Sequence, residues 1–86
     1  MVLPLYQKHL IDALRIGSRM WMDNFGKTTY HININNKIKE INEPTILTLV
    51  WHGLIKMNGN EYVLTELGIS ANIFSVDEGK KTLYSM

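Results

Sequence analysis

The sequence predicts one α+β domain over residues 1–86, in which a helix is followed by inserted strands, a second helix, a β-hairpin and a short C-terminal helix. Three observations predict this class. Apolar residues recur at helical spacing near the N-terminus and after Asn42, residues 19–41 alternate as strands do, and an Asn-Gly pair at 58–59 separates two short runs. A hydrophobic fraction of 45% supplies enough apolar surface for a modest core.

The first helix is expected from about residue 4 to 16. Pro4 suits its first turn, where a missing N–H costs nothing, and Gly17 is a natural stop. Its apolar face is expected to consist of Leu5, Leu10, Ile11, Leu14 and Ile16.

Residues 19–41 change from helical to strand periodicity. The stretch "DNFGK" predicts a turn between two runs rich in aromatic and β-branched residues, and Asn35-Asn36 predicts a second turn, because Asn tolerates left-handed backbone. The following "KIKEI" fits a third strand or a short helix, and we favour the strand.

The second helix is expected at about residues 43–52. Asn42 is a good N-cap, and Pro44 fits the first turn. Gly53 is expected to close the helix in a left-handed conformation. The predicted core face of this helix carries Ile46, Leu49 and Val50.

A hairpin turning at Asn58-Gly59 is expected next, because this dipeptide is the strongest two-residue hairpin pattern. Thr65 then caps a last short helix, and Ile69 and Ile73 are expected to close the core. No structure is assigned to the tail from about residue 76.

The charge and residue totals narrow the classes of function. Nine basic and eight acidic residues give a formal charge of +1, which counts against a DNA-binding domain, since phosphate contacts usually require a basic excess. The absence of cysteine excludes disulfides and thiolate sites and fits a cytoplasmic location. Lys8 and His9 interrupt the N-terminal apolar run that a signal peptide needs, and no run is long enough to span a membrane.

We expect no catalysis, no cofactor and no metal. The three histidines, His9, His31 and His52, have no partner at metal-ligand spacing, so ordinary surface or half-buried roles are favoured. No serine lies in a nucleophile elbow, and "DNFGK" has too few glycines for a phosphate-binding loop.

The stretch from residue 44 to 72 resembles the second half of a winged helix-turn-helix domain. Proteins of that superfamily show a Thr in the helix, an apolar pair, "GLI", a short wing and a strand that ends in "LT" followed by Gly. The matching residues are Thr45, Ile46, Leu49, Val50, Gly53, Leu54, Ile55, Asn58, Gly59, Tyr62, Leu64, Thr65 and Gly68. The predicted strands before the recognition-like helix resemble a small bacterial or phage type with a β-hairpin inserted after helix one.

The resemblance implies a small regulatory protein that binds double-stranded DNA. On that reading Thr45, Thr48 and His52 approach the major groove, while Lys56 and the wing asparagines Asn58 and Asn60 contact the phosphate backbone.

The alternative is a protein-interaction module or inhibitor on the same frame. Leu47 and Trp51 lie four residues apart and therefore share one stripe of the helix, where base-reading helices carry Arg, Lys, Asn or Gln. A Trp-and-Leu stripe suits the centre of an interface with a host protein or with a second copy of the chain. It also suits packing beneath the inserted strands, against Met20 or Met22, and both interpretations stay open.

Overall fold

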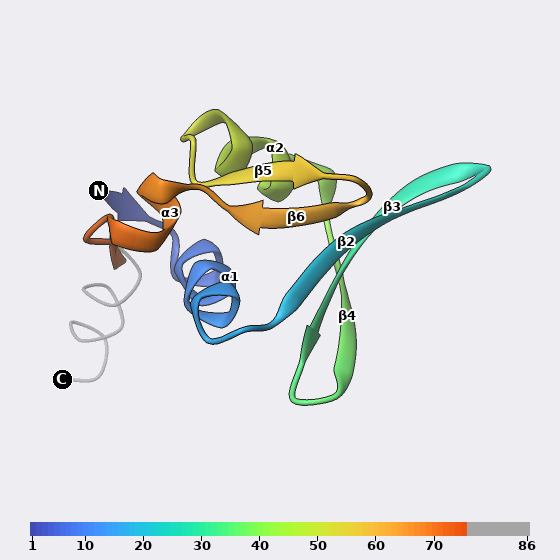
Figure 1. The fold of residues 1–86 in the computed structure, drawn as a ribbon, viewed down its shortest axis with the longest axis horizontal. Helices are drawn as coiled ribbons and strands as arrows, with labels where there is room; N and C mark the ends of the chain where they lie inside the picture. The colour runs from blue at the N-terminus through green and yellow to red at the C-terminus, as the bar shows by residue number, and fades with distance from the viewer. Residues whose placement is uncertain (76–86) are drawn as a thin grey trace, which may run out of the picture.

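The computed structural model describes residues 1–75, so the tail from about residue 76 lies outside the described part of the chain. The described residues form a small α+β domain with three helices and a five-stranded antiparallel sheet (Figure 1). In chain order the elements are β1 (Val2–Leu3), α1 (Leu5–Arg15), β2 (Arg19–Phe25), β3 (Lys27–Ile34), β4 (Lys37–Ile41), α2 (Glu43–Trp51), β5 (Ile55–Asn58), β6 (Glu61–Leu64), α3 (Glu66–Ser70) and β7 (Phe74–Ser75).

The sheet joins the two predicted groups of strands. Its order is β4-β3-β2-β6-β5, so that β2 pairs with β6 through Met20–Tyr62 and Trp21–Glu61. The far part of the β2–β3 hairpin pairs only with itself and projects from the body (Figure 1). The short strands β1 and β7 pair in parallel and bring the first residues beside residues 74 and 75.

The core lies between the helices and one face of this sheet. Met20, Ile32 and Ile41 of the strands and Ile11 of α1 are at most 1% exposed, and Ile46 of α2 is completely buried. The buried hydrophobic residues are Leu3, Leu10, Ile11, Ala13, Met20, Tyr30, Ile32, Ile41, Ile46, Leu49, Leu54, Ile55 and Tyr62. Because buried strand residues alternate with half-exposed ones, the opposite face of the sheet carries a second, more polar set of side chains.

The predicted elements are confirmed with small shifts of their ends. The segment "KIKEI" is the strand β4, and the turn before it places Asn35 and Asn36 at φ of 53° and 63°. Positive φ at both central residues is the requirement of a type I′ hairpin turn, which Asn meets at low cost.

The β5–β6 turn differs by one residue from the prediction. Asn58 pairs with Glu61, so the central pair of the turn is Gly59-Asn60 rather than Asn58-Gly59. Gly59 has φ of 70°, whereas Asn60 is not in the positive-φ region. A single positive φ at the first central position is the geometry of a type II′ turn, for which Gly is the natural residue.

The predictions that Ile16 and Ile69 lie in the core are wrong. Ile16 follows the last residue of α1 and is 83% exposed, because the chain leaves the helix there before it can turn this side chain inward. Ile69 is 63% exposed because α3 docks through Gly68, where an added Cβ would lie 2.1 Å from the Leu54 carbonyl oxygen. Ile73 does pack against the core, as predicted.

Hydrogen bonds between side chains and the backbone hold α3 in that position. The Thr65 hydroxyl donates to the carbonyl of Gly53, and its oxygen accepts from the N–H of Gly68 at 3.0 Å, which is the predicted N-cap. Arg15 of α1 donates to the carbonyl oxygens of Gly68 at 3.0 Å and Ala71 at 2.7 Å. A cation at the C-terminal end of α3 thus satisfies carbonyls that the helix leaves free.

Candidate interaction surfaces

The start of α2 is fixed by local hydrogen bonds. The Asn42 side chain accepts from the N–H of Thr45 at 3.0 Å, which confirms it as the N-cap. Glu43 accepts from the hydroxyl of Tyr30 at 3.0 Å and so ties the helix to β3. Burial and this bond raise the pKa of the Tyr30 hydroxyl. The helix therefore has one orientation against the sheet.

That orientation differs from the predicted one by a rotation. We expected Ile46, Leu49 and Val50 to face the core, but the buried residues of α2 are Thr45, Ile46 and Leu49. At 100° per residue the buried face is turned by about 50° toward Thr45. The single rotation accounts for both errors: Val50 is 41% exposed, and Thr45, expected at the DNA-facing surface, is only 8% exposed.

The same rotation directs Trp51 away from the core. Trp51 is 84% exposed and Leu47 is 56% exposed, and together with Val50 they form a surface that we call the α2 face. The interpretation in which Trp51 packs beneath the strands, against Met20 or Met22, is wrong, because a side chain packed there would not be 84% exposed. The accessibility of the Leu47 and Trp51 stripe is confirmed.

Two of the other residues expected at DNA have local roles beside this face. The Thr48 hydroxyl donates to the Pro44 carbonyl at 2.8 Å, as polar residues inside helices often do. His52 is half-buried and meets Trp51 edge to face, with ring centroids 5.6 Å apart. Both residues remain next to the α2 face, and Thr45 does not.

The β5–β6 hairpin carries the remaining residues expected to contact phosphate. Lys56, Asn58 and Asn60 are all exposed there. The neighbouring Glu61 accepts two hydrogen bonds from Arg19, both 3.0 Å long. This bidentate bond lowers the pKa of Glu61, mainly because the guanidinium donates to the ionised carboxylate.

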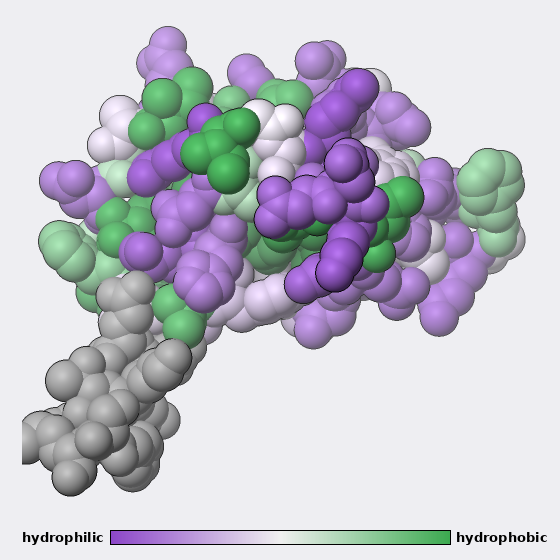
Figure 2. Space-filling model, turned by 90° about the horizontal axis from the view of Figure 1, so that it is seen from below, coloured by the Kyte–Doolittle hydropathy of each residue, from purple (hydrophilic) through white to green (hydrophobic). Residues whose placement is uncertain are grey.

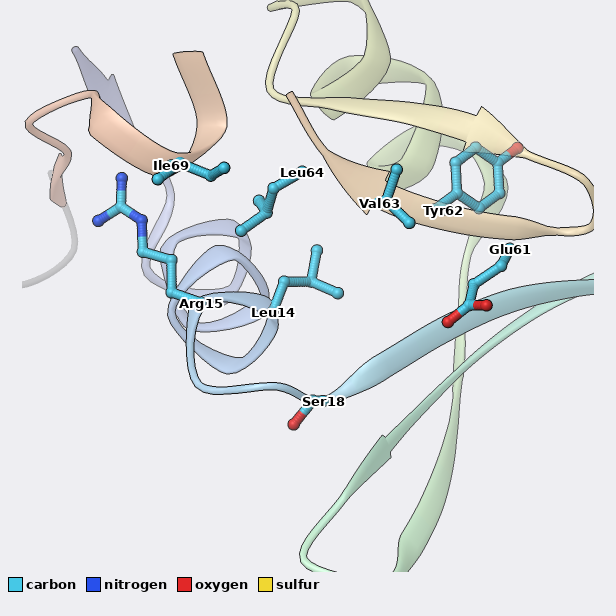
Figure 3. Close-up of a pocket in the computed structure, with 8 residues that line it drawn as sticks. All are labelled: Leu14, Arg15, Ser18, Glu61, Tyr62, Val63, Leu64 and Ile69. Atoms are coloured by element: carbon cyan, nitrogen blue, oxygen red, sulfur yellow. The ribbon is translucent and has the colours of Figure 1, made fainter. Parts of the chain in front are cut away.

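A cleft opens between α1 and β6 (Figure 3). It has a volume of about 630 Å³, and Leu14 and Leu64 point toward one another across it. Arg15 at its rim is directed to α3, where its Nε and one of its terminal nitrogens donate to backbone carbonyls. The cleft is therefore a loosely filled part of the helix–sheet packing whose one cation is engaged.

The sheet face opposite the core was not singled out by sequence reasoning. Cross-strand register places Glu40, His31, Trp21, Glu61 and Asn58 in one row that crosses all five strands from β4 to β5. We call this surface the outer sheet face. Alternation within β2 and β3 indicates that Trp21 and His31 lie opposite the core residues, but the register that makes them neighbours depends on the fold.

A polar network holds Trp21 in this row. Its indole stacks on the His31 ring with centroids 5.8 Å apart, and its Nε1–H donates to the Asp23 carboxylate at 3.3 Å. The same carboxylate lies 3.4 Å from Nε2 of His31, and the Thr29 hydroxyl lies 3.0 Å from that nitrogen. A catalytic triad needs its carboxylate and hydroxyl on opposite nitrogens of the imidazole, so this network positions the indole rather than activating Thr29.

The rest of the outer surface is mainly polar. Figure 2, which views the molecule from below, shows a largely hydrophilic surface with scattered hydrophobic groups, one of them at the far end of the β2–β3 hairpin. Phe25 at that end is 89% exposed. Among residues 1–75 no group of three or more His, Asp or Glu side chains could hold a metal ion, and no helix is long and apolar enough to cross a membrane.

Comparisons of this chain with models of protein families, with curated proteins and with solved structures find no match.

Proposed function

We propose that this domain is a protein-interaction module that binds a partner through the α2 face. The observation that carries the proposal is the 84% exposure of Trp51 beside Leu47 and Val50. Large aromatic side chains with aliphatic neighbours are the usual centres of binding energy at protein interfaces. A contiguous apolar group of this kind is costly to leave in water, so a bound state that covers it is favoured.

The surroundings of the face support a protein partner over DNA. Glu43 and Pro44 lie at the N-terminal end of α2, and no Lys or Arg lies within the helix. The chain as a whole carries a charge of only +1. An apolar centre with few charges fits a protein interface and offers little to phosphate. The proposal places the module in the cytoplasm. A chain without cysteine forms no disulfides and so needs no oxidising compartment.

The first experiment measures self-association by sedimentation equilibrium over a wide range of concentration. If the partner is a second copy, the wild-type chain dimerises and Trp51→Ala weakens the dimer by about 2 kcal/mol, the usual cost of losing a central aromatic residue. Phe25→Ala is the matched control, since Phe25 is equally exposed but lies far from α2 on the hairpin tip. Equal effects of the two substitutions would contradict a specific role for the α2 face.

A foreign partner is tested by placing a photo-crosslinking amino acid at position 51, and separately at position 25, in cells of the natural source. We expect a discrete crosslinked protein from position 51 that is absent from position 25 and is lost with Leu47→Asp. A chain that is monomeric at all concentrations and gives no such product would refute the proposal.

A second candidate is DNA binding of the winged-helix type. The observation that favours it is the order of α2, an exposed β5–β6 hairpin and α3, with Lys56, Asn58 and Asn60 accessible on the hairpin and Thr48 and His52 beside it. Duplex binding should then weaken steeply with salt, and Lys56→Ala should reduce the slope by about one unit. No binding to a broad panel of duplexes in dilute buffer would eliminate this candidate.

A further inference from the structure

A shallow hollow lies beside Trp21 on the outer sheet face, about 260 Å³ in volume. The residues that line it are Arg19, Trp21, Asn33, Asn60 and Glu61. They come from β2, β3, β6 and the β5–β6 turn, so only the folded sheet brings them together. The hollow is on the opposite side of the sheet from the buried core residues Met20 and Tyr62 and is separate from the α2 face.

The indole in this hollow is held before any ligand arrives. One face of Trp21 is stacked on His31, and its N–H is bound to Asp23. Trp21 lines the hollow, whereas His31 does not. A side chain fixed in this way loses little conformational entropy on binding, which is what a preorganised contact surface requires.

The polar groups around the indole are of two kinds. Arg19 and Glu61 are bound to each other through two hydrogen bonds of 3.0 Å, so their charges cancel within the hollow. The side-chain amides of Asn33 and Asn60 have no hydrogen-bond partner among the described residues. Each amide offers both a donor and an acceptor, and the carboxylate and guanidinium retain further capacity at their outer edges.

We propose that this hollow is a binding site for one ring of a neutral sugar. The apolar C–H face of the ring stacks on Trp21, as apolar surfaces do on the large amphipathic face of an indole. The hydroxyl groups around the ring bond to the amides of Asn33 and Asn60 and to the Arg19–Glu61 pair. The volume lies below the range of about 300–1,000 Å³ that encloses drug-sized ligands, so the site fits a single ring that belongs to a longer chain.

Charge selects the sugar over a nucleotide, whose base would also stack on the indole. The only cation that lines the hollow is already neutralised by Glu61, and the Asp23 carboxylate accepts the indole N–H of Trp21. A phosphate would meet no free positive charge there and would approach an anion at short range. A neutral ring with many hydroxyl groups avoids that repulsion.

The test follows Trp21 in a Trp51→Phe variant, in which it is the single indole. The probes are maltotriose, cellotriose, chitotriose, xylotriose and mannotriose, with uridine monophosphate and oligothymidylate as the competing class. We expect at least one oligosaccharide to produce a saturable change in indole emission and in the Nε1–H resonance of Trp21. Neither nucleotide probe should do so at the same concentration.

Variants separate the site from a general effect on folding. Asn60→Ala changes an exposed turn residue and is expected to weaken binding by about tenfold, the loss of one or two hydrogen bonds. Trp21→Ala removes the reporter indole, so its binding is followed by titration calorimetry, which should detect none. Asn58→Ala, an exposed neighbour that does not line the hollow, should leave binding unchanged. The proposal is overturned if no oligosaccharide gives a saturable change, if a nucleotide probe binds more tightly, or if Asn58→Ala and Asn60→Ala have equal effects.

Discussion

Trp21 lies half-buried in the middle strand of the five-stranded sheet, whereas Trp51 ends α2 with 84% of its surface exposed. The first is stacked on a histidine and bound to a carboxylate through its N–H. The second meets the His52 ring edge to face and has no hydrogen bond to its N–H within the described residues. One residue type thus occurs in a polar, fixed setting and in an apolar, open one.

The difference shows how surroundings decide what an indole can bind. On the outer sheet face, polar partners lie at fixed distances around Trp21, and that arrangement selects a small ligand with hydrogen-bonding groups. On the α2 face, Trp51 has Leu47 and Val50 as neighbours and gains most from burial against another apolar surface. The two surfaces are carried by one core, and the following predictions test how far they are independent.

The largest effect is expected from Gly68→Ala, which tests whether both surfaces belong to one cooperative unit. The new Cβ would lie 2.1 Å from the Leu54 carbonyl oxygen, so α3 must move away from the core. We expect a loss of about 3 kcal/mol in the free energy of unfolding, even after the better helix propensity of alanine. Urea unfolding followed separately in the Trp21→Phe and Trp51→Phe backgrounds measures it, and Gly68→Ala should lower the midpoint by the same amount in both backgrounds.

Gly26→Ala at the tip of the β2–β3 hairpin is the matched control for that experiment. Gly26 also lacks a Cβ but has no atom within 4 Å of the position where one would be added. Its φ of 75° makes alanine cost about 1 kcal/mol through backbone strain alone. Equal losses for the two variants would show that α3 does not pack as closely as described.

Replacing each tryptophan separately should give unequal losses of stability. Trp21→Ala removes a half-buried side chain and leaves the Asp23 carboxylate without one donor, so we expect a cost of about 2 kcal/mol, below that of a fully buried tryptophan. Trp51→Ala removes an exposed side chain and should change stability by less than about 0.5 kcal/mol. Thermal unfolding of dilute, monomeric protein measures both, and the reverse order would contradict the assignment of the two settings.

Gly53 follows the C-cap of α2 in a left-handed conformation. Its φ of 75° is unfavourable for a β-branched residue, and Gly53→Val should destabilise the domain by more than about 1 kcal/mol. The nearest side-chain atom to an added Cβ, on Leu67, is 3.9 Å away, so the cost comes from the backbone and not from a clash. Gly53→Asn should recover much of the loss, because Asn tolerates left-handed backbone. An unchanged melting temperature for Gly53→Val would argue against this conformation.

The sequence predicted local structure well and side-chain partners poorly, for reasons that particular residues show. Asn42, Gly53 and Thr65 act through their own backbone and neighbours, so their roles follow from short patterns. The rotation of α2 depends on the bond from Tyr30 to Glu43 and on the packing of a helix only nine residues long, and a pattern of three apolar residues does not fix it within about 50°.

The outer sheet face was missed because no short pattern encodes it. Trp21 and His31 are ten positions apart, and they become neighbours only through the register of β2 against β3. Asn60 reaches the hollow only because β6 pairs with β2 and not with β4. Alternation shows which residues share a face of one strand, but strand order and register are properties of the whole sheet.

The pH dependence of stability should distinguish the α2 region from the outer sheet face. The α2 region is expected to respond at alkaline pH. Burial and the bond to Glu43 raise the pKa of Tyr30, which anchors the start of α2. A raised pKa gives stability that is complete below the ordinary tyrosine pKa and is lost as pH rises through the raised value. The melting temperature should therefore fall above about pH 10. Tyr30→Phe should make that fall shallower, and the contribution of Tyr62, whose pKa burial also raises, should remain.

The smallest effect on the melting temperature is expected at acid pH. It arises from a pair of charges on the outer sheet face. The bidentate bond from Arg19 lowers the pKa of Glu61 from its ordinary 4.5. A lowered carboxyl pKa gives stability that is present above the ordinary value and is lost as pH falls through the lowered one. Because the pair is exposed, water and salt screen it, and its loss should shift the melting temperature only slightly. Glu61→Gln should remove that acid shift and leave the alkaline one intact, whereas Tyr30→Phe should do the reverse. If Glu61→Gln altered both ends equally, the two regions would share one electrostatic network, and the separation of the Trp21 hollow from the α2 face would fail.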